Sequence, residues 1–199
     1  MLYVFVVLSL RRRRLVHVGV TEHPTAAWSA QRLLEAVVDS DEVARFLVHD
    51  RDSIFGAAFR KRVRGLGVRA LATPPRSPQA NAFCERVIGT IRRGCTDHVL
   101  FRDEHHAERV LREYASYYDG RPHRGLHMQP PDAAGHLAPI RPPSGTRIGA
   151  FPILAGLHHR YGFSTSPPGA DAANRAGSLT RTDFLRRSGL HHRYERRAA

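Results

Sequence analysis

The amino-acid sequence predicts an α/β fold in which a mixed sheet is flanked by helices. Three observations support it: two apolar, β-rich runs near the N-terminus, two shorter apolar runs downstream, and helical spacing of apolar residues between and after them. The predicted order is strand, strand, helix, strand, helix, strand, helix, and such alternation is typical of α/β proteins. With 199 residues, 42% of them hydrophobic, the chain suits one domain with a tail.

The N-terminal segment is predicted to form a hairpin followed by a helix. The runs Leu2 to Leu10 and Leu15 to Val20 are rich in β-favouring residues and are joined through Arg11 to Arg14. The first run is too short to span a bilayer, and its charges follow it instead of preceding it, so a strand fits better than a signal peptide. Thr25 is placed to cap a helix over Ala26 to Val38.

The central segment alternates between strand and helix patterns. The short apolar run Phe46 to Val48 predicts a strand, and Asp50 follows where polar residues begin. A helical pattern covers Ala57 to Gly65, and a second apolar run, Val68 to Ala72, is expected to form the next strand. Thr73-Pro74-Pro75 then breaks the chain before the next helix.

That next helix is expected to start with Ser77 as its N-cap and Pro78 at its first position. Its apolar residues keep i, i+3, i+4, i+7 spacing and are Cys84, Val87, Ile88, Ile91 and Cys95. A different stripe of the helix carries Asn81, Glu85, Gly89 and Arg92. The two cysteines are interpreted as small core residues, and their spacing fits neither a metal motif nor a disulfide framework, which favours a reducing compartment.

Two carboxylates of this region could work together. Asp50 follows a strand and Glu85 lies on a helix, so both can approach one divalent cation if the helix packs beside the strand. Mg2+ prefers carboxylate oxygens and keeps several waters, so few acids suffice. Taken alone, the pair would be interpreted as a strand-end residue and a solvated helix residue.

The residues around these acids carry a family resemblance. The motifs HDRDSIFG, with Phe59 downstream, and SPQANAFCER resemble the second and third acidic motifs of the DDE transposase and retroviral-type integrase core, especially of insertion-sequence transposases. In that family an Asp is followed about 35 positions later by a Glu, and Asp50 and Glu85 are 35 positions apart. The resemblance runs from Leu2 to Pro131 and includes YYDGRPHRGLHMQPPD.

The resemblance implies a ribonuclease H-like mixed sheet flanked by helices, with an integrase catalytic core at residues 1–138. In that family the sheet begins with a strand that carries the first catalytic Asp, whereas Met1 here stands at what looks like the second strand. No acid upstream of Asp50 lies within an apolar strand run, the five being Glu22, Glu35, Asp39, Asp41 and Glu42. We therefore expect a core that lacks its first strand and one of its three carboxylates.

The resemblance also implies the site residues. Asp50 and Glu85 would be catalytic and would hold Mg2+ or Mn2+, and the motif favours Asp50 over the nearby Asp52. Four residues are expected to contact DNA. Asn81 and Arg92 would face it, Gly89 would let the DNA backbone approach because it lacks a side chain, and Arg76 would contact a phosphate.

The formal charge is +13, from 31 Lys and Arg against 18 Asp and Glu. Such an excess suits a polyanion, either nucleic acid or an anionic membrane surface, although the arginine bias of a GC-rich genome would also produce it. No long apolar amphipathic helix accompanies the charge, so DNA is the expected partner. We expect the protein to be cytoplasmic and associated with DNA. Association with further copies of itself as a homo-oligomer is also expected.

From Pro139 the sequence becomes rich in Pro, Gly, Ser and Arg without periodicity, so residues 139–199 are predicted to be a disordered, low-order basic tail. The segment GLHHRY occurs twice in it, at Gly156 to Tyr161 and Gly189 to Tyr194. The expected function is DNA integration and transposition, by metal-dependent strand cleavage and transfer in intact relatives, with this chain a truncated and inactive copy. A non-catalytic DNA-binding remnant and a ribonuclease H-like nuclease remain as alternatives.

Overall fold

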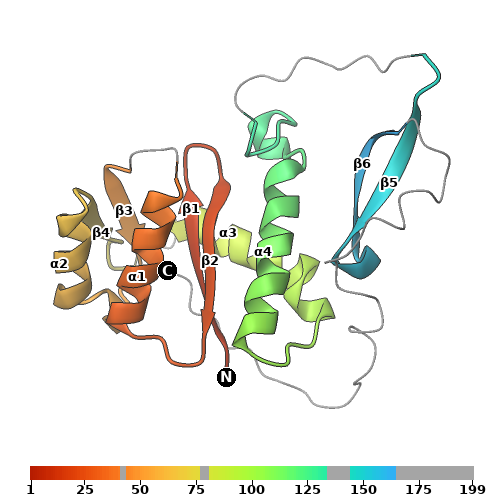
Figure 1. The fold of residues 1–199 in the computed structure, drawn as a ribbon. Coiled ribbons are helices and arrows are strands. Elements are labelled where there is room, and N and C mark those ends of the chain that lie inside the picture. The colour runs from red at the N-terminus through yellow and green to blue at the C-terminus, as the bar shows by residue number, and fades with distance from the viewer. Residues whose placement is uncertain (41–43, 77–80, 134–143, 165–199) are drawn as a thin grey trace. The chain divides into compact units, whose positions relative to one another are not determined.

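The computed structural model describes residues 1–40, 44–76, 81–133 and 144–164 (Figure 1). The described residues divide into two compact units, the first within residues 1–111 and the second comprising residues 112–133 and 144–164. The predicted domain boundary at residue 138 stays a prediction. Among the described residues, none of the helices is both long enough and apolar enough to cross a membrane.

The first unit starts with the predicted hairpin. Strands β1 (Tyr3–Ser9) and β2 (Arg14–Thr21) pair antiparallel, with Tyr3 opposite Thr21 and an irregularity between Val7 and Leu8. At the turn, Arg13 adopts a positive φ of 56°, a conformation that few side chains adopt without strain. The arginine run therefore forms the turn of the hairpin, with Arg11 exposed and Arg12 and Arg13 partly buried.

Helix α1 (Ala26–Val38) has the predicted bounds and the predicted cap. The hydroxyl oxygen of Thr25 accepts a 3.1 Å hydrogen bond from the backbone N–H of Trp28, which satisfies one of the donors left free at a helix start. One face of α1 enters the core of this unit, whose buried members are Phe5, Ala30, Leu33, Phe55, Phe59, Val63 and Val68. The helix thus packs against residues of both the hairpin and the next strand–helix–strand segment.

That segment is a parallel βαβ unit, as the sequence predicts. Strand β3 (Phe46–His49) leads through a short 3₁₀ turn at Ser53–Phe55 to helix α2 (Ala57–Gly65) and then to β4 (Arg69–Ala72). The two strands pair parallel with Phe46 opposite Arg69. The apolar face of α2 is buried through Phe59 and Val63, which explains the periodicity of the sequence there.

The predicted single mixed sheet is present as separate pairs. Within the described residues, β1 is hydrogen-bonded to β2 and β3 to β4, but the two pairs are not joined to each other. The mixed α/β class is confirmed, with one antiparallel and one parallel pair in the first unit. The sequence could indicate strands and their faces, but the apolar patterns do not determine which edges meet.

Helix α3 (Ala82–Gly94) carries Glu85 in its first turn and is followed by helix α4 (Glu104–Gly120). The predicted apolar stripe of α3 is buried at Val87, Ile91 and Cys95. The predicted N-cap pair, Ser77 and Pro78, lies outside the described residues.

The second unit contains a strand pair that the sequence analysis did not predict. Strands β5 (Arg147–Ile153) and β6 (His158–Ser164) form an antiparallel hairpin within the segment expected to be a low-order tail, so that prediction is wrong for these residues. The hairpin contacts the C-terminal half of α4. There the ring of Tyr117, on α4, stacks on the ring of His158, on β6, with the two ring centroids 4.5 Å apart. Gly149 and Pro152 lie in β5, and Gly162 lies in β6. Because glycine and proline are uncommon inside strands, they obscured the alternation of apolar and polar residues that predicts a strand.

Candidate functional site

Asp50 follows β3 directly and is built into the turn that leaves this strand. One of its carboxylate oxygens accepts a 2.9 Å hydrogen bond from the backbone N–H of Asp52. The Asp52 carboxylate in turn accepts from the backbone N–H of Ile54 at 3.1 Å and from the Ser53 hydroxyl at 3.3 Å. Asp52 therefore caps the short 3₁₀ turn, whereas Asp50 lies at the strand end that the sequence motif favours.

His49 supports the backbone at Asp50 from inside the protein. Its side chain is only 2% exposed and packs against Phe55 and Phe59, with ring centroids 5.0 Å and 6.1 Å away. The Nδ1 atom lies 2.6 Å from the carbonyl oxygen of Asp50, so in this tautomer Nδ1–H donates to that oxygen. The Nε2 atom is buried and has no hydrogen-bond partner in the described part of the chain.

Glu85 is an exposed residue in the first turn of α3, where a negative charge is favoured by the helix dipole. Its neighbour Cys84 reports on the surrounding charges. Burial raises the pKa of the Cys84 thiol above its ordinary value, and the negative charges of Asp50 and Glu85 raise this pKa further. The effect of Glu85 follows from its place next to Cys84 in the chain, whereas Asp50 acts from a distant part of the sequence.

This arrangement can be tested against the divalent metal that the sequence implies. Asp50 and Glu85 offer carboxylate oxygens, the ligands that Mg2+ prefers, and Mg2+ is commonly bound by one or two carboxylates together with substrate phosphates. Cys84 is a soft ligand whose thiol is held protonated, so it does not suit this metal. Among the residues described, no group of three or more His, Cys, Asp or Glu side chains is assembled for a metal ion. The two carboxylates are therefore of the chemical kind that Mg2+ prefers.

Three of the residues expected at the DNA lie at or near the surface. Arg76 is exposed in a turn and has a positive φ of 55°. Asn81 occupies the N-cap position of α3 and is half-buried. Arg92 is about half exposed, with its Nε atom 3.3 Å from a carboxylate oxygen of Asp97. Such an exposed pair is weak in water, so the Arg92 guanidinium can exchange Asp97 for a phosphate at little cost.

The structure shows which side chain lies next to Gly89. It is buried, and a Cβ atom added to it would lie 3.2 Å from Nη1 of Arg93. The Arg93 side chain therefore covers the position where the DNA backbone was expected to approach. The periodicity of α3 places Gly89 away from its apolar stripe, but it does not reveal that a long side chain one turn later folds back over the glycine.

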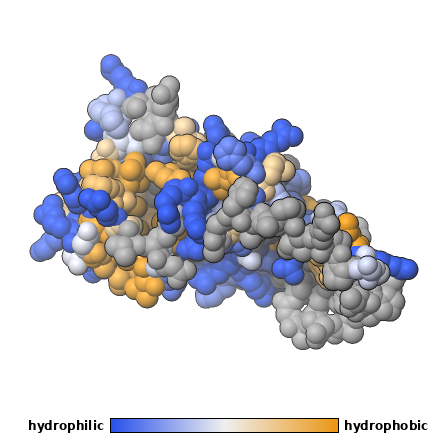
Figure 2. All heavy atoms as spheres, turned by 90° about the horizontal axis from the view of Figure 1, so that it is seen from above, coloured by the Kyte–Doolittle hydropathy of each residue, from blue (hydrophilic) through white to orange (hydrophobic). Residues whose placement is uncertain are grey.

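The sequence analysis missed one basic contact beside Glu85. The guanidinium of Arg13, from the β1–β2 turn, lies 5.0 Å from the ring centroid of Phe83, and that of Arg86 lies 6.0 Å from the same ring. Phe83 is 43% exposed. On the face seen in Figure 2, hydrophilic side chains likewise stand next to apolar surface. The RRRR run, expected only as a turn, thus brings a cation to the start of α3.

Comparisons with known proteins address the family. Residues 66–131 match the family described as "Integrase core domain", a segment that includes β4, α3 with Glu85, and α4. No curated protein matches the chain. Among solved structures, the chain is similar to one in the cryo-EM structure of the simian T-cell lymphotropic virus intasome in complex with PP2A regulatory subunit B56 gamma. The TM-score is 0.48 at 13% sequence identity, over 74% of this chain and 55% of that chain.

Proposed function

We propose that this chain is a DNA-binding protein of the transposase and integrase class, with a ribonuclease H-like core, because residues 66–131 match the integrase core family. Intact proteins of this class cleave and join DNA strands with a divalent metal. Asp50 and Glu85 are the candidate catalytic residues of this chain. Its partner is DNA, and we expect it to be cytoplasmic and to associate with further copies of itself.

One observation carries the assignment of the two acids. Asp50 and Glu85 come from a strand end and a helix that are separated by 35 positions, and both raise the pKa of the same thiol, Cys84. Glu85 is the neighbour of Cys84 in the sequence, so the informative effect is that of Asp50, which acts on the same thiol from the end of β3. The convergence supports a shared role at one site.

Different residues of the chain would bind the metal and hold the metal-binding carboxylate in position. Asp50 and Glu85 would hold Mg2+ or Mn2+, which, when bound, would lower the negative charge that develops on a phosphate under attack. The turn hydrogen bond from Asp52 N–H fixes the orientation of the Asp50 carboxylate. His49 holds the Asp50 carbonyl from the buried side, so the strand end is rigid where the carboxylate projects.

DNA binding is proposed to rest on phosphate contacts. Arg76, Asn81 and Arg92 are accessible on or before α3, and Arg93 takes the place expected for Gly89. Arginine can hold a phosphate with two parallel hydrogen bonds, which suits a chain whose formal charge is +13. Such contacts position a duplex without reading its sequence.

A second candidate function is DNA binding without catalysis. It is supported because, in the described portion of the chain, no three His, Cys, Asp or Glu side chains are grouped for a metal ion. A ribonuclease H-like nuclease would need the same metal set, so it is disfavoured for the same reason.

The experiment that tests the proposal measures metal and DNA separately. Mn2+ binding to the full chain is followed by electron paramagnetic resonance, and DNA binding by fluorescence anisotropy of a labelled duplex. We expect Asp50→Asn and Glu85→Gln each to weaken Mn2+ binding, while Asp97→Asn, an exposed acid in the same unit, leaves it unchanged. DNA binding without any Mn2+ binding would select the non-catalytic function, and absence of both would reject the proposal.

A further inference from the structure

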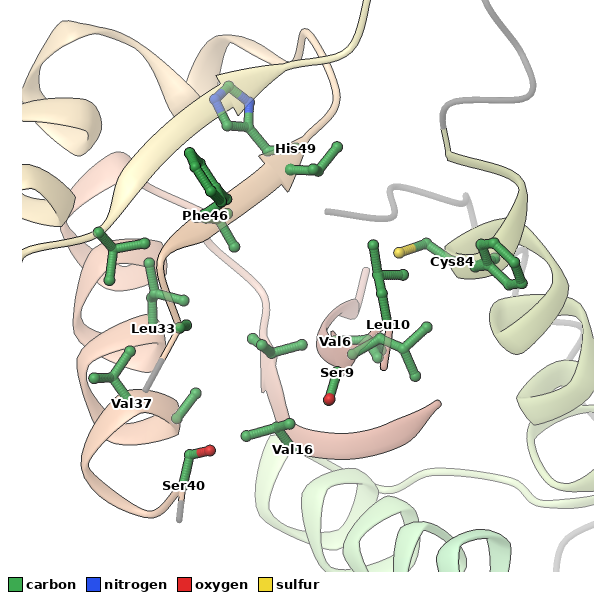
Figure 3. Close-up of a pocket in the computed structure, with 18 of the residues that line it drawn as sticks. Val6, Ser9, Leu10, Val16, Leu33, Val37, Ser40, Phe46, His49 and Cys84 are labelled. Carbon is green, nitrogen blue, oxygen red and sulfur yellow. The ribbon is translucent and has the colours of Figure 1, made fainter. Parts of the chain in front are cut away.

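The first unit contains a cavity of about 590 Å³ that the proposed function does not use. In Figure 3 its walls come from β1, α1 and β3 and from the start of α3, where Cys84 points toward it. The first strand of the expected sheet would lie between β1 and β3, in this space. We therefore assign no ligand to the cavity.

The β5–β6 hairpin of the second unit has two faces that differ in their contacts. In an antiparallel pair, opposite residues point to the same face, and successive residues of one strand point to opposite faces. His158, Gly162 and Phe151 therefore share one face. There the ring of His158 stacks on Tyr117 of α4, and a Cβ atom added to Gly162 would lie 3.3 Å from the Phe151 ring. This inner face is the one that contacts α4.

The outer face of the hairpin carries exposed apolar and aromatic side chains. The register places three residues of β5 on it opposite three residues of β6, namely Ile148, Ala150 and Pro152 opposite Phe163, Tyr161 and His159. Ile148 is 74% exposed, Tyr161 70% and Phe163 47%. Large apolar side chains exposed next to one another are typical of interaction surfaces. The outer face therefore differs from the inner face in having surface available for a ligand.

Tyr161 and Phe163 present two aromatic rings along one strand. They are two positions apart, so they follow each other at about 6.8 Å along β6. Aromatic rings exposed on a sheet surface are platforms on which successive unpaired bases stack, because every base has a π surface. Bases of a duplex are already stacked on one another and are not accessible to such rings. The two rings therefore suit a single strand and not a duplex.

The charge of the hairpin suits the phosphates of such a strand. Residues 133–170 contain no Asp or Glu, so no carboxylate of this segment repels a phosphate. Arg147 and Arg160 are exposed, and His159 lies on the outer face beside the rings. The register directs both arginines to the inner face, but the two strands lie only about 4.8 Å apart, so long side chains reach the edges of this narrow ribbon. Rings and cations thus border one surface.

We propose that the outer face of the β5–β6 hairpin binds a single strand of nucleic acid. Tyr161 and Phe163 would stack on two successive bases, and Arg147 and Arg160 would contact the phosphates beside them. Such binding depends little on sequence, because stacking does not read the edges of the bases. A chain that binds neither metal nor duplex could still bind a single strand here, so the proposal does not rest on the proposed function.

The test uses the full chain and the fluorescence anisotropy of a labelled oligothymidine, beside a labelled duplex of the same length. The double variant Tyr161→Leu with Phe163→Leu removes both rings but keeps apolar side chains. We expect it to bind the single strand at least about tenfold less tightly, a difference of about 1.4 kcal/mol, and to leave duplex binding unchanged. Met128→Ala is the control, because Met128 is 60% exposed in the same unit but outside the hairpin, and it should change neither affinity.

Two results of this measurement would overturn the proposal. One is an unchanged affinity of the double variant for the single strand. The other is an equal loss for the single strand and the duplex, which would show that the rings do not distinguish unpaired bases. Duplex binding by the unaltered chain is judged separately, so its absence would count against the proposed function alone.

A conservative variant tests stacking directly. Tyr161→Trp keeps a ring at this position and should bind the single strand as tightly as the unaltered chain does. Its added fluorescence should be quenched by oligothymidine but not by duplex, with the unaltered chain as reference, since Trp28 is its one tryptophan. This measurement also decides the question if the double leucine variant does not fold, as judged by circular dichroism. Absence of added quenching would contradict stacking at Tyr161.

Salt dependence separates the cations from the rings. Arg160→Ala should weaken single-strand binding and reduce the slope of log affinity against log salt by about 0.7, the value for one phosphate contact of a single strand. Tyr161→Leu should weaken binding without changing this slope. A change of slope in Tyr161→Leu that equals the change in Arg160→Ala would contradict the assigned roles.

Further arms identify the source of the strand and test other occupants. Tighter binding of oligothymidine than of oligouridine would assign DNA to the site, and the reverse would assign RNA. Sedimentation velocity and binding to anionic phospholipid vesicles are compared for the unaltered chain and the double leucine variant. If the variant loses self-association or vesicle binding but keeps its single-strand affinity, the outer face belongs to a second copy or to a lipid surface, and the proposal is wrong.

Discussion

The carboxylate of Glu113 accepts a 2.8 Å hydrogen bond from the backbone N–H of Leu154 in the second unit. Glu113 lies on α4, and Leu154 starts the short 3₁₀ turn between β5 and β6. Leu154 is 1% exposed and has a positive φ of 52°, so its backbone is held in an unusual conformation inside the protein. This contact fixes the turn of the β5–β6 hairpin to the helix.

Replacing Glu113 should release that turn. In Glu113→Ala the Leu154 N–H loses a charged acceptor, and we expect a loss of about 1–3 kcal/mol in the stability of the hairpin. Glu113→Gln keeps an acceptor oxygen and should lose less. Hydrogen exchange of residues 147–164 measures both. Unchanged exchange in Glu113→Ala would mean that the stacking of Tyr117 on His158 alone holds the hairpin.

The hairpin also shows where inference from sequence fails. Each of its strands contains a glycine, and β5 contains Pro152, so composition predicted a segment without regular structure. The pairing depends instead on partners distant in sequence, such as Glu113 and Tyr117 on α4. A local pattern carries no information about such contacts.

The N-terminal half could be predicted closely because its signals are local. The hydroxyl of Thr25 caps α1 at the predicted residue, and the spacing of Phe59 and Val63 predicts the buried face of α2. The positions of Asp50 and Glu85 on a strand end and a helix were predictable for the same reason. That β1 and β3 are not paired with each other, and that Arg93 covers Gly89, depends on long-range packing and side-chain direction.

The thiol of Cys84 provides a probe of the two acids. Because negative charge disfavours the thiolate, removing either charge in Asp50→Asn or Glu85→Gln should lower the pKa of Cys84. Alkylation by iodoacetamide at a fixed pH near 8 should then be faster, since the thiolate is the reactive form. Cys95 is fully buried and should react slowly in every variant. Asp97→Asn is the control. An unchanged pH profile in Asp50→Asn would place Asp50 away from the thiol.

DNA binding should weaken steeply as salt concentration rises. Arginines that neutralise phosphates release counterions from the duplex, so the logarithm of the affinity falls linearly with the logarithm of the salt concentration. Arg76→Ala and Arg92→Ala should each weaken binding to all sequences alike and reduce the salt slope by about 1. Arg92→Lys keeps the charge and should retain the slope. Binding that is insensitive to salt would exclude a phosphate interface.

The substitution Gly89→Ala tests the role of the glycine in α3. Alanine favours a helix interior over glycine by up to about 1 kcal/mol, and the nearby atom is the flexible end of Arg93, which can shift. We expect the variant to unfold at a higher temperature while its affinity for DNA is unchanged. Arg93→Ala is the companion variant and should bind DNA less tightly. A large loss of DNA affinity in Gly89→Ala alone would restore the original view that the glycine admits the DNA backbone.

The chain of 199 residues should fold but show no appreciable strand transfer. Its core packs around Phe59 and Leu33, so apolar burial holds the strand pairs and helices without the chemistry. The chemistry is more demanding, because a positioning error of about 1 Å can cost on the order of a hundredfold in rate. In the part of the chain that the structure describes, Asp50 and Glu85 have no third metal-binding side chain grouped with them. The measurement is cleavage and joining of a DNA end from the parent mobile element with Mn2+. It compares this chain with one extended by an Asp-bearing strand before Leu2.

Activity in the extended chain alone would assign the defect to a missing carboxylate. Robust activity of the 199-residue chain, abolished in Glu85→Gln, would instead show that another acid completes the site.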